Sequence, residues 1–191
     1  VEFNLNGGRC FTDFIDNAGG VDCSDHEVNM KILLDDLVAN GDLTVKQRNE
    51  WLFKQTEDVS RLVLRNNYRQ TQALGLAFTE SSRRVEEYRR LINSMEAAGK
   101  LNRSLEFLPL DDDITERKTR GLGLTRPELS VLISYVKGDL KEQLIRENVA
   151  EDAYLEDAVT TVFPEKMLKK FEGLMRQHRL KSEIVATQVA N

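Results

Sequence analysis

Hydrophobic and polar positions alternate with a period of two at the start of the chain and with a helical period almost everywhere after it. In residues 1–5 the apolar Val, Phe and Leu alternate with polar residues, which predicts a half-buried strand. Residues 6–8 (Asn-Gly-Gly) predict a turn, and residues 10–15 predict a second short strand that Gly19-Gly20 ends. The pattern therefore predicts a small extended piece at the N-terminus.

Capping boxes predict the starts of three helices. In such a box a Ser or Thr side chain accepts a hydrogen bond from a free backbone amide, and a Glu or Gln three residues later reaches back. The pairs are Ser24–Glu27, Thr44–Gln47 and Thr125–Glu128. Gly41 and Gly99 follow apolar stripes and predict helix ends.

Apolar residues recur at helical spacing through the rest of the chain. The ranges with such stripes are 28–37, 59–77, 85–95, 129–144, 152–162 and 167–175. Asn66 and Gln70 fall inside the second stripe, where a buried polar side chain needs a partner. The predicted fold class is mainly α, a multi-helix bundle with a short extended N-terminal segment.

Composition narrows the class of protein. The chain has 191 residues, of which 40% are hydrophobic and 31% charged, as in an ordinary folded domain. Its 27 basic and 32 acidic residues give a net charge of −5, which argues against a nucleic-acid partner. Two cysteines are too few for a disulfide framework, and no signal peptide or membrane-spanning run is present. We expect a cytoplasmic protein with no membrane partner.

The ends of the chain are abrupt. It starts with Val-Glu-Phe, without an initiator Met, and it stops within a helical pattern at Asn191. We therefore expect a fragment of a longer polypeptide, or its only ordered portion.

The candidates for metal binding and nucleophilic catalysis are weak. Cys10, Cys23 and His26 are possible ligands, but no second paired set follows, so no metal site is predicted. Ser24 and Cys23 lie close to His26, yet side chains two residues apart at a helix start diverge. The acidic run at 111–113 fits the start of a short helix better than a calcium loop.

Residues 16–27 (DNAGGVDCSDHE) hold the most special residue types of any stretch. A strand end, a Gly-Gly turn and a helix N-terminus would together form an anion- or nucleotide-binding site. A carboxylate near Val21 and Ser24 would be stabilised there. A tight turn without a ligand fits the same residues, and the pattern alone leaves the two readings open.

The same stretch resembles a known family. Residues 13–21 (DFIDNAGGV), followed by Ser24 and Glu27, resemble the glutamate dehydrogenase segment that reads Asn-Ala-Gly-Gly-Val, two residues, Ser, two residues, Glu. The longer form here resembles the large bacterial NAD-specific glutamate dehydrogenases in particular. Further supporting stretches are 64–72 (LRNNYRQTQ), 123–129 (GLTRPEL), 178–180 (HRL) and 186–188 (ATQ).

The resemblance implies a reaction and a set of roles. The parent would convert L-glutamate, NAD and water to 2-oxoglutarate, ammonia and NADH. Ser24 would contact the distal carboxylate of the substrate, and Val21 would line its pocket. Asn17 would lie near the nicotinamide, and Gly19 and Gly20 would let the backbone approach the cofactor closely.

The resemblance also implies what the chain lacks. The family's catalytic Lys and Asp and its dinucleotide fingerprint have no counterpart here, so no catalytic residue is assigned and the chain alone should not turn over glutamate. Asp25-His26 stands where short members carry an aromatic pair, which could alter the pocket.

The expected domain division is residues 1–23, the end of a Rossmann-like dinucleotide-binding domain, and residues 24–191, a helical C-terminal region. The intact protein is expected to be a homo-oligomer. The alternative is that residues 42–191 form a helical interaction or regulatory module without catalysis of its own. A contiguous exposed apolar patch would favour that module, whereas Asn66 and Gln70 turned towards Ser24 would favour a substrate pocket.

Overall fold

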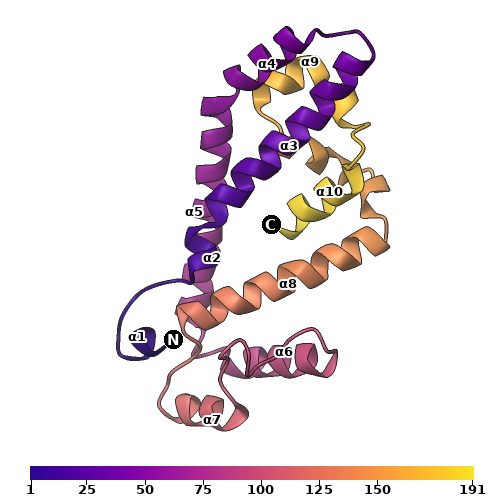
Figure 1. The fold of residues 1–191 in the computed structure, drawn as a ribbon. Helices are drawn as coiled ribbons and strands as arrows, with labels where there is room; N and C mark the ends of the chain where they lie inside the picture. The colour runs from indigo at the N-terminus through magenta and orange to yellow at the C-terminus, as the bar shows by residue number, and fades with distance from the viewer. The chain divides into compact units, whose positions relative to one another are not determined.

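A computed structural model describes residues 1–191 and shows a chain of helices joined by short loops (Figure 1). The α-helices are α1 (Glu2–Leu5), α2 (Asp13–Asp16), α3 (Ala18–Ala39), α4 (Val45–Lys54), α5 (Thr56–Glu80), α6 (Val85–Ala97), α7 (Asp111–Thr119), α8 (Arg126–Arg146), α9 (Glu165–Met175) and α10 (Lys181–Ala190). There are two 3-10 helices, η1 (Val149–Glu151) and η2 (Glu156–Val162), and η2 lies where an α-helix was expected at 152–162. The mainly α fold is confirmed. None of the helices combines the length and apolar character that crossing a bilayer requires.

The two predicted N-terminal strands are wrong. The first region forms α1, the second overlaps α2, and residues 1–191 include no strand. A strand needs a partner to take up its backbone hydrogen bonds, and an unpaired segment satisfies them locally. In α1 the Leu5 amide donates to the Val1 carbonyl and the Asn6 amide to the Glu2 carbonyl, both at 3.0 Å. Short-range hydrogen bonding therefore overrides the alternating pattern.

Helix α3 begins well before the predicted start. Asn17 is its N-cap residue, and Gly19 and Gly20 lie inside its first turn instead of breaking the chain. Ser24 is consequently in the helix interior, where backbone amides already donate to carbonyls four residues earlier. The predicted Ser24–Glu27 capping box is wrong, and so is the strand–turn–helix junction built on it.

Three further predicted helix boundaries are confirmed. Thr44 and Gln47 form a capping box, with the Thr44 amide donating to Gln47 Oε1 at 2.8 Å. Gly41 and Gly99 follow α3 and α6 with φ of +82° and +69°, a conformation that glycine adopts without strain. Helix α8 continues through Gly138.

The chain divides into two compact units. Unit 1 comprises residues 1–16 and 68–138, and unit 2 comprises residues 17–67 and 139–191, so α5 and α8 each contribute to both. Helix α3 is continuous across residues 23 and 24. The division at that point, between a dinucleotide-binding domain and a helical region, stays a prediction.

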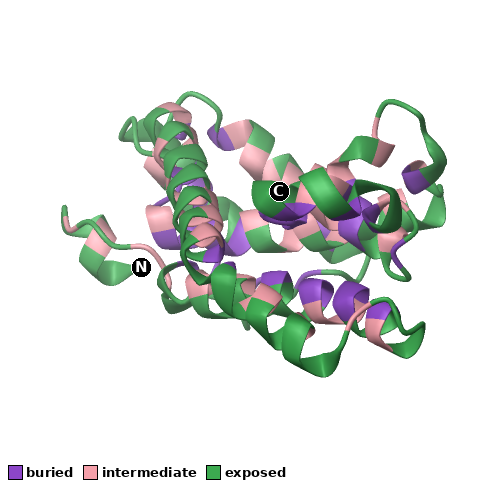
Figure 2. Cartoon of the chain, turned by 90° about the horizontal axis from the view of Figure 1, so that it is seen from above, coloured by how far each residue is buried: buried purple, intermediate pink, exposed green.

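The core of unit 2 surrounds α3. Buried and exposed positions alternate along the helices (Figure 2), as expected for amphipathic helices around a core. Trp51 of α4 and Phe171 of α9 meet edge to face with ring centroids 5.2 Å apart. The buried apolar residues of this core are Met30, Leu33, Leu34, Leu37, Val59, Ala150, Val159, Val162, Phe163, Met167, Phe171, Met175, Ile184 and Val185.

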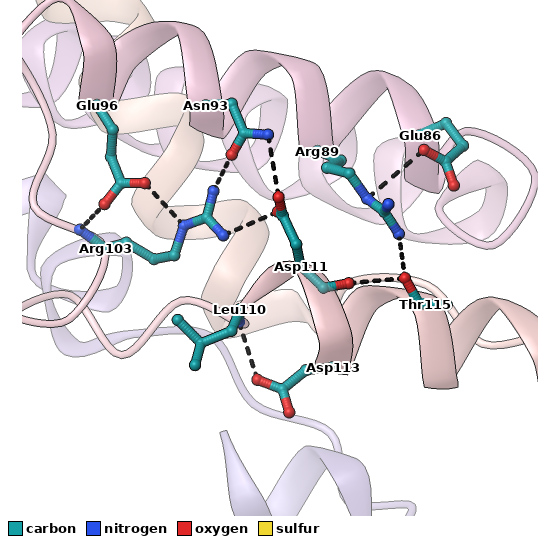
Figure 3. Close-up of polar contacts among 9 residues, drawn as sticks. All are labelled: Glu86, Arg89, Asn93, Glu96, Arg103, Leu110, Asp111, Asp113 and Thr115. Atoms are coloured by element: carbon teal, nitrogen blue, oxygen red, sulfur yellow. Dashed lines mark hydrogen bonds and ion pairs between the residues drawn. The ribbon is translucent and has the colours of Figure 1, made fainter.

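Unit 1 has its own core and a polar network beside it. The core residues are Ile15, Leu74, Val85, Ile92, Met95, Leu101, Leu108, Ile114, Leu124, Leu129, Val131 and Leu132. Arg103, almost fully buried, joins α6 to α7 by ion pairs with Glu96 at 3.0 Å and Asp111 at 2.9 Å (Figure 3). The side chains around Arg103 are paired with one another, so this network has a structural role.

Candidate functional site

The predicted site residues lie on the first turns of α3. Successive residues of an α-helix are about 100° apart, so Asn17, Gly20, Val21 and Ser24 share one side of the helix. All four are exposed, and Val21 has 75% of its surface accessible. We call these four residues the outer face of α3.

The two glycines of the motif have different surroundings. A Cβ on Gly19 would lie 3.4 Å from Val63 Cγ1, so Gly19 is where α3 packs against α5. A Cβ on Gly20 would meet nothing within 4 Å. A Cβ at position 19 would therefore make an ordinary van der Waals contact with α5, whereas a Cβ at position 20 would face open space.

Ser24 has no hydrogen-bond role inside the chain. It does not cap α3, which begins at Ala18, and its exposed hydroxyl has no intrachain partner. The neighbouring Glu27 forms an ion pair with Lys31 one turn along the helix. The Ser24 hydroxyl is thus available to a ligand.

The opposite side of α3 is held by polar contacts. Asn66 Nδ2 of α5 donates to Asp22 Oδ2 at 3.0 Å. His26, 1% exposed, directs Nδ1 at the Val162 carbonyl of η2 at 2.6 Å and Nε2 at Asp22 Oδ1 at 3.7 Å. Further along, His178 Nε2 donates to the Asn29 carbonyl at 3.1 Å.

The two histidines have opposite electrostatic surroundings. Burial alone would lower the pKa of His26, but the hydrogen bond and charge of Asp22 and the Val162 carbonyl raise the pKa above its usual value. Burial lowers the pKa of His178, and its Nδ1 accepts a hydrogen bond from the Leu180 amide at 3.1 Å, which requires an unprotonated nitrogen. Both rings serve helix packing, and neither is accessible to a substrate.

The weaker candidate chemistries gain no support. No group of three or more His, Cys, Asp or Glu side chains in residues 1–191 is arranged to hold a metal ion. Cys10 and Cys23 are exposed free thiols. The His26 ring is engaged by Val162 and Asp22, away from the outer face that carries Ser24.

The second motif, residues 123–129, has a structural explanation. Ser81 Oγ accepts from the Leu124 amide at 2.5 Å, and a Cβ on Gly123 would overlap the Ser81 backbone. Glu128 is 1% exposed and accepts two hydrogen bonds from Arg117, at 2.8 and 3.0 Å. Its Oε2 also accepts from the Thr125 amide at 2.7 Å, which confirms the predicted capping box.

The polar residues of the third motif, residues 64–72, find separate partners. Asn66 bonds Asp22 on α3, whereas Gln70 accepts from Lys137 Nζ at 2.9 Å. Asn66 thus reaches the helix that carries Ser24, but on its opposite side. The sequence pattern had singled out Asn66 as a polar residue in an apolar stripe, and it gave no signal for the role of Asp22.

Family models match both ends of the chain. Residues 1–77 match the model described as "Bacterial NAD-glutamate dehydrogenase, catalytic domain", and residues 121–191 match "Glutamate dehydrogenase, C-terminal". The first match contains α3 and the second contains the Glu128 cap. Both motifs therefore lie in segments that match glutamate dehydrogenase models.

Curated relatives extend the match over the whole chain. It is 59% identical to an NAD-specific glutamate dehydrogenase of Pseudomonas aeruginosa, 54% to one of Halomonas elongata and 38% to one of Mycobacterium tuberculosis, each over all 191 residues. The chain spans 12% of the length of each relative. Over its whole length the chain therefore corresponds to a segment of the large NAD-specific glutamate dehydrogenases that it matches.

Proposed function

We propose that the chain is part of an NAD-dependent glutamate dehydrogenase and supplies one wall of its active site through the outer face of α3. The overall reaction is L-glutamate, NAD⁺ and water to 2-oxoglutarate, ammonium, NADH and a proton. One observation carries the proposal: within the segment matched to the catalytic-domain model, the chain itself makes no use of the outer face. A ligand-binding surface needs side chains that the chain does not already use for its own packing or hydrogen bonds.

Each residue of the outer face has a proposed task. The Ser24 hydroxyl donates a hydrogen bond to the distal carboxylate of glutamate, and the Val21 methyls contact the aliphatic part of the substrate. Asn17 and Gly20 lie towards the nicotinamide, where the open space at Gly20 admits a close approach. Gly19 lies on the side of α3 that faces Val63 of α5, away from the outer face.

NAD accepts the hydride when it is bound, and the rest of that site is proposed to lie outside residues 1–191. No glycine-rich strand–turn–helix segment occurs in the chain, so its own residues fit one edge of the cofactor only. The catalytic Lys and Asp of the family have no counterpart in the chain, so we assign the acid–base residues to the remainder of the parent protein. We propose that the chain alone is inactive and that the intact enzyme is a cytoplasmic homo-oligomer.

A helical interaction module remains the second candidate, and one observation favours it. Val45, Lys46, Asn49, Glu50 and Phe53 of α4 line an open surface depression. Phe53 is 82% exposed, and an exposed aromatic side chain of this kind is typical of a docking surface. This surface shares no residue with the outer face of α3, so the two functions are separable by mutation.

The test of the proposed function is Ser24→Ala in the full-length enzyme. A hydrogen bond to a charged group contributes about 1.5–3 kcal/mol, so KM for glutamate should rise roughly 10- to 100-fold. The matched control is Ser60→Ala, which removes an exposed hydroxyl from α5 and should leave KM unchanged. An unchanged KM in Ser24→Ala would remove the carboxylate role.

A further inference from the structure

The outer face of α3 lies beyond the hydrophobic core of its unit. The first α3 residue in that core is Met30, nine positions after Val21. At 1.5 Å per residue this is about 13 Å along the helix axis. Apolar packing fixes the second half of α3, and other contacts must fix its first turns.

A hydrogen bond between α5 and α3 lies close to those first turns. Asn66 Nδ2 donates to Asp22 Oδ2 at 3.0 Å. Asp22 directly follows Val21 and comes two residues before Ser24, so at about 100° per residue Asp22 and Ser24 point to opposite sides of the helix. A contact at Asp22 therefore restrains the rotation of the turn that carries Ser24, from the side of the helix away from any ligand of Ser24.

A second contact, one turn later, also restrains α3 on this side. The buried His26 ring hydrogen-bonds the Val162 carbonyl at 2.6 Å and lies 3.7 Å from Asp22 Oδ1. The Asp22 carboxylate thus lies between a neutral amide donor and an imidazole whose pKa it raises. Together these groups tie α3 to α5 and to η2.

We propose that Asp22 and Asn66 are positioning residues, whose hydrogen bond sets the rotation of the first turns of α3 and so directs Ser24 at the substrate. The inference rests on the proposed function. The outer radius of a helix with its side chains is about 6 Å, so a rotation of 10° moves a side-chain tip by about 1 Å. A misplacement of that size costs about 100-fold in rate where geometry is critical.

The first experiment is a double-mutant cycle in the full-length enzyme with Asn66→Ala and Ser24→Ala. Asn66→Ala should raise KM for glutamate about 10-fold, the effect of about 1.4 kcal/mol. If Asn66 acts through Ser24, the double variant should lie within about threefold of Ser24→Ala alone. Gln72→Ala, at an exposed position of the same helix, is the control and should leave KM unchanged.

A second pair of variants keeps the test decisive if Asn66→Ala fails to fold. Asp22→Asn and Asp22→Ala both remove the negative charge, but only Asn retains an oxygen that accepts from Asn66. Asp22→Asn should therefore stay within about threefold of wild-type KM, and Asp22→Ala should show the 10-fold increase of Asn66→Ala. A purely structural role predicts equal thermal destabilisation without this difference in KM.

The possible outcomes distinguish the positioning role of Asp22 and Asn66 from the carboxylate role of Ser24. Suppose that Ser24→Ala raises KM. If Asn66→Ala alone leaves KM unchanged, or if the two increases multiply in full in the double variant, the positioning role is overturned and the carboxylate role stands. If Ser24→Ala leaves KM unchanged, the carboxylate role fails and the positioning role fails with it. A non-additive cycle together with the expected Asp22 pair supports both.

Discussion

Residues 17–24 and residues 123–129 both lie in segments that match glutamate dehydrogenase models, and both contain glycines, but the chain uses them differently. In the second segment the chain fills the space around Gly123, and Glu128 bonds Arg117 and Thr125. In the first segment Gly20 faces open space and Ser24 faces solvent. Contacts within the chain thus explain Gly123 and Glu128, but they do not explain Gly20 and Ser24.

The difference gives a criterion for function. A residue whose identity is explained by its own neighbours needs no ligand to account for it. Residues on the outer face of α3 lack such an explanation, while Asp22 and His26 on the other side of the same helix have one. Stability and activity should therefore respond to substitutions in different segments.

The largest expected effect is on Glu128. Its carboxylate is buried with Arg117, and removing one member of a buried ion pair leaves the other charge unpaired. Glu128→Ala should lower the free energy of unfolding by about 3–5 kcal/mol, measured by urea denaturation of the 191-residue chain. Glu116→Ala, which breaks the exposed pair with Arg120, should change it by less than about 0.5 kcal/mol. A loss at Glu128 no larger than that of the control would contradict this account of the segment.

Gly123→Ala should have the next largest effect. The added Cβ would overlap the Ser81 backbone, so the loop before α8 must shift. We expect a loss of about 1–3 kcal/mol, as for other overpacked sites, seen as a lower urea midpoint with an unchanged m-value. Hydrogen exchange should show faster opening of the Leu124 amide, whose partner is Ser81 Oγ. Wild-type exchange at that amide would show that the loop absorbs the methyl group without strain.

Gly20→Ala should act in the opposite direction on stability. Alanine is more favourable than glycine in a helix, by up to about 0.5–1 kcal/mol in the interior and less in a first turn such as that of Gly20, and nothing in the chain obstructs the new Cβ. In the full-length enzyme the same methyl group should raise KM for NAD about 10-fold, which corresponds to about 1.4 kcal/mol. Gly138→Ala in α8 has equally open surroundings and should give the stability gain alone. If both variants leave KM for NAD unaltered, the cofactor does not approach Gly20.

The smallest expected effects concern pH. The chain has two histidines, so an NMR titration assigns both with one variant. The pKa of His26 is raised above 6.5, so its contribution to stability is fully present below pH 6.5 and is lost as the pH rises through the folded-state value. The pKa of His178 is lowered, so its contribution is present above pH 6.5 and is lost as the pH falls through the folded-state value. His26→Gln should abolish the loss on the alkaline side only, and two histidines titrating at the same pH would refute the assignment.

The predictions that succeeded rest on short-range interactions. Thr44 with Gln47 and Thr125 with Glu128 lie three residues apart, so the sequence contains both partners of each cap. Ser24 has the same local signature, but α3 already runs through it, and a cap signal means nothing inside a helix. The extent of α3 depends on contacts such as Asn66 with Asp22, which are 44 residues apart and leave no local trace.

The strand prediction failed for a related reason. Alternation in residues 1–5 indicates a strand only if another strand lies beside it, and the described chain provides none. The roles of the residues on the outer face of α3 stay a prediction that rests on the resemblance to the family, and the conformation expected for that stretch was wrong. Its residues were expected in a turn, and they lie on a continuous helix.

The sequence separation of the contacts that hold α3 determines when each of them can form during synthesis of the chain. His26 bonds a carbonyl 136 residues later, and Asn29 receives its bond from a residue 149 positions later. At about 5–20 residues per second, a ribosome needs roughly 7 to 27 s to produce Val162 after His26. During that interval the apolar side of α3 has no η2 or α9 to cover it. The contact between His26 and η2 therefore forms late, when the last third of the chain has emerged, whereas Asn66, 44 residues after Asp22, is available earlier.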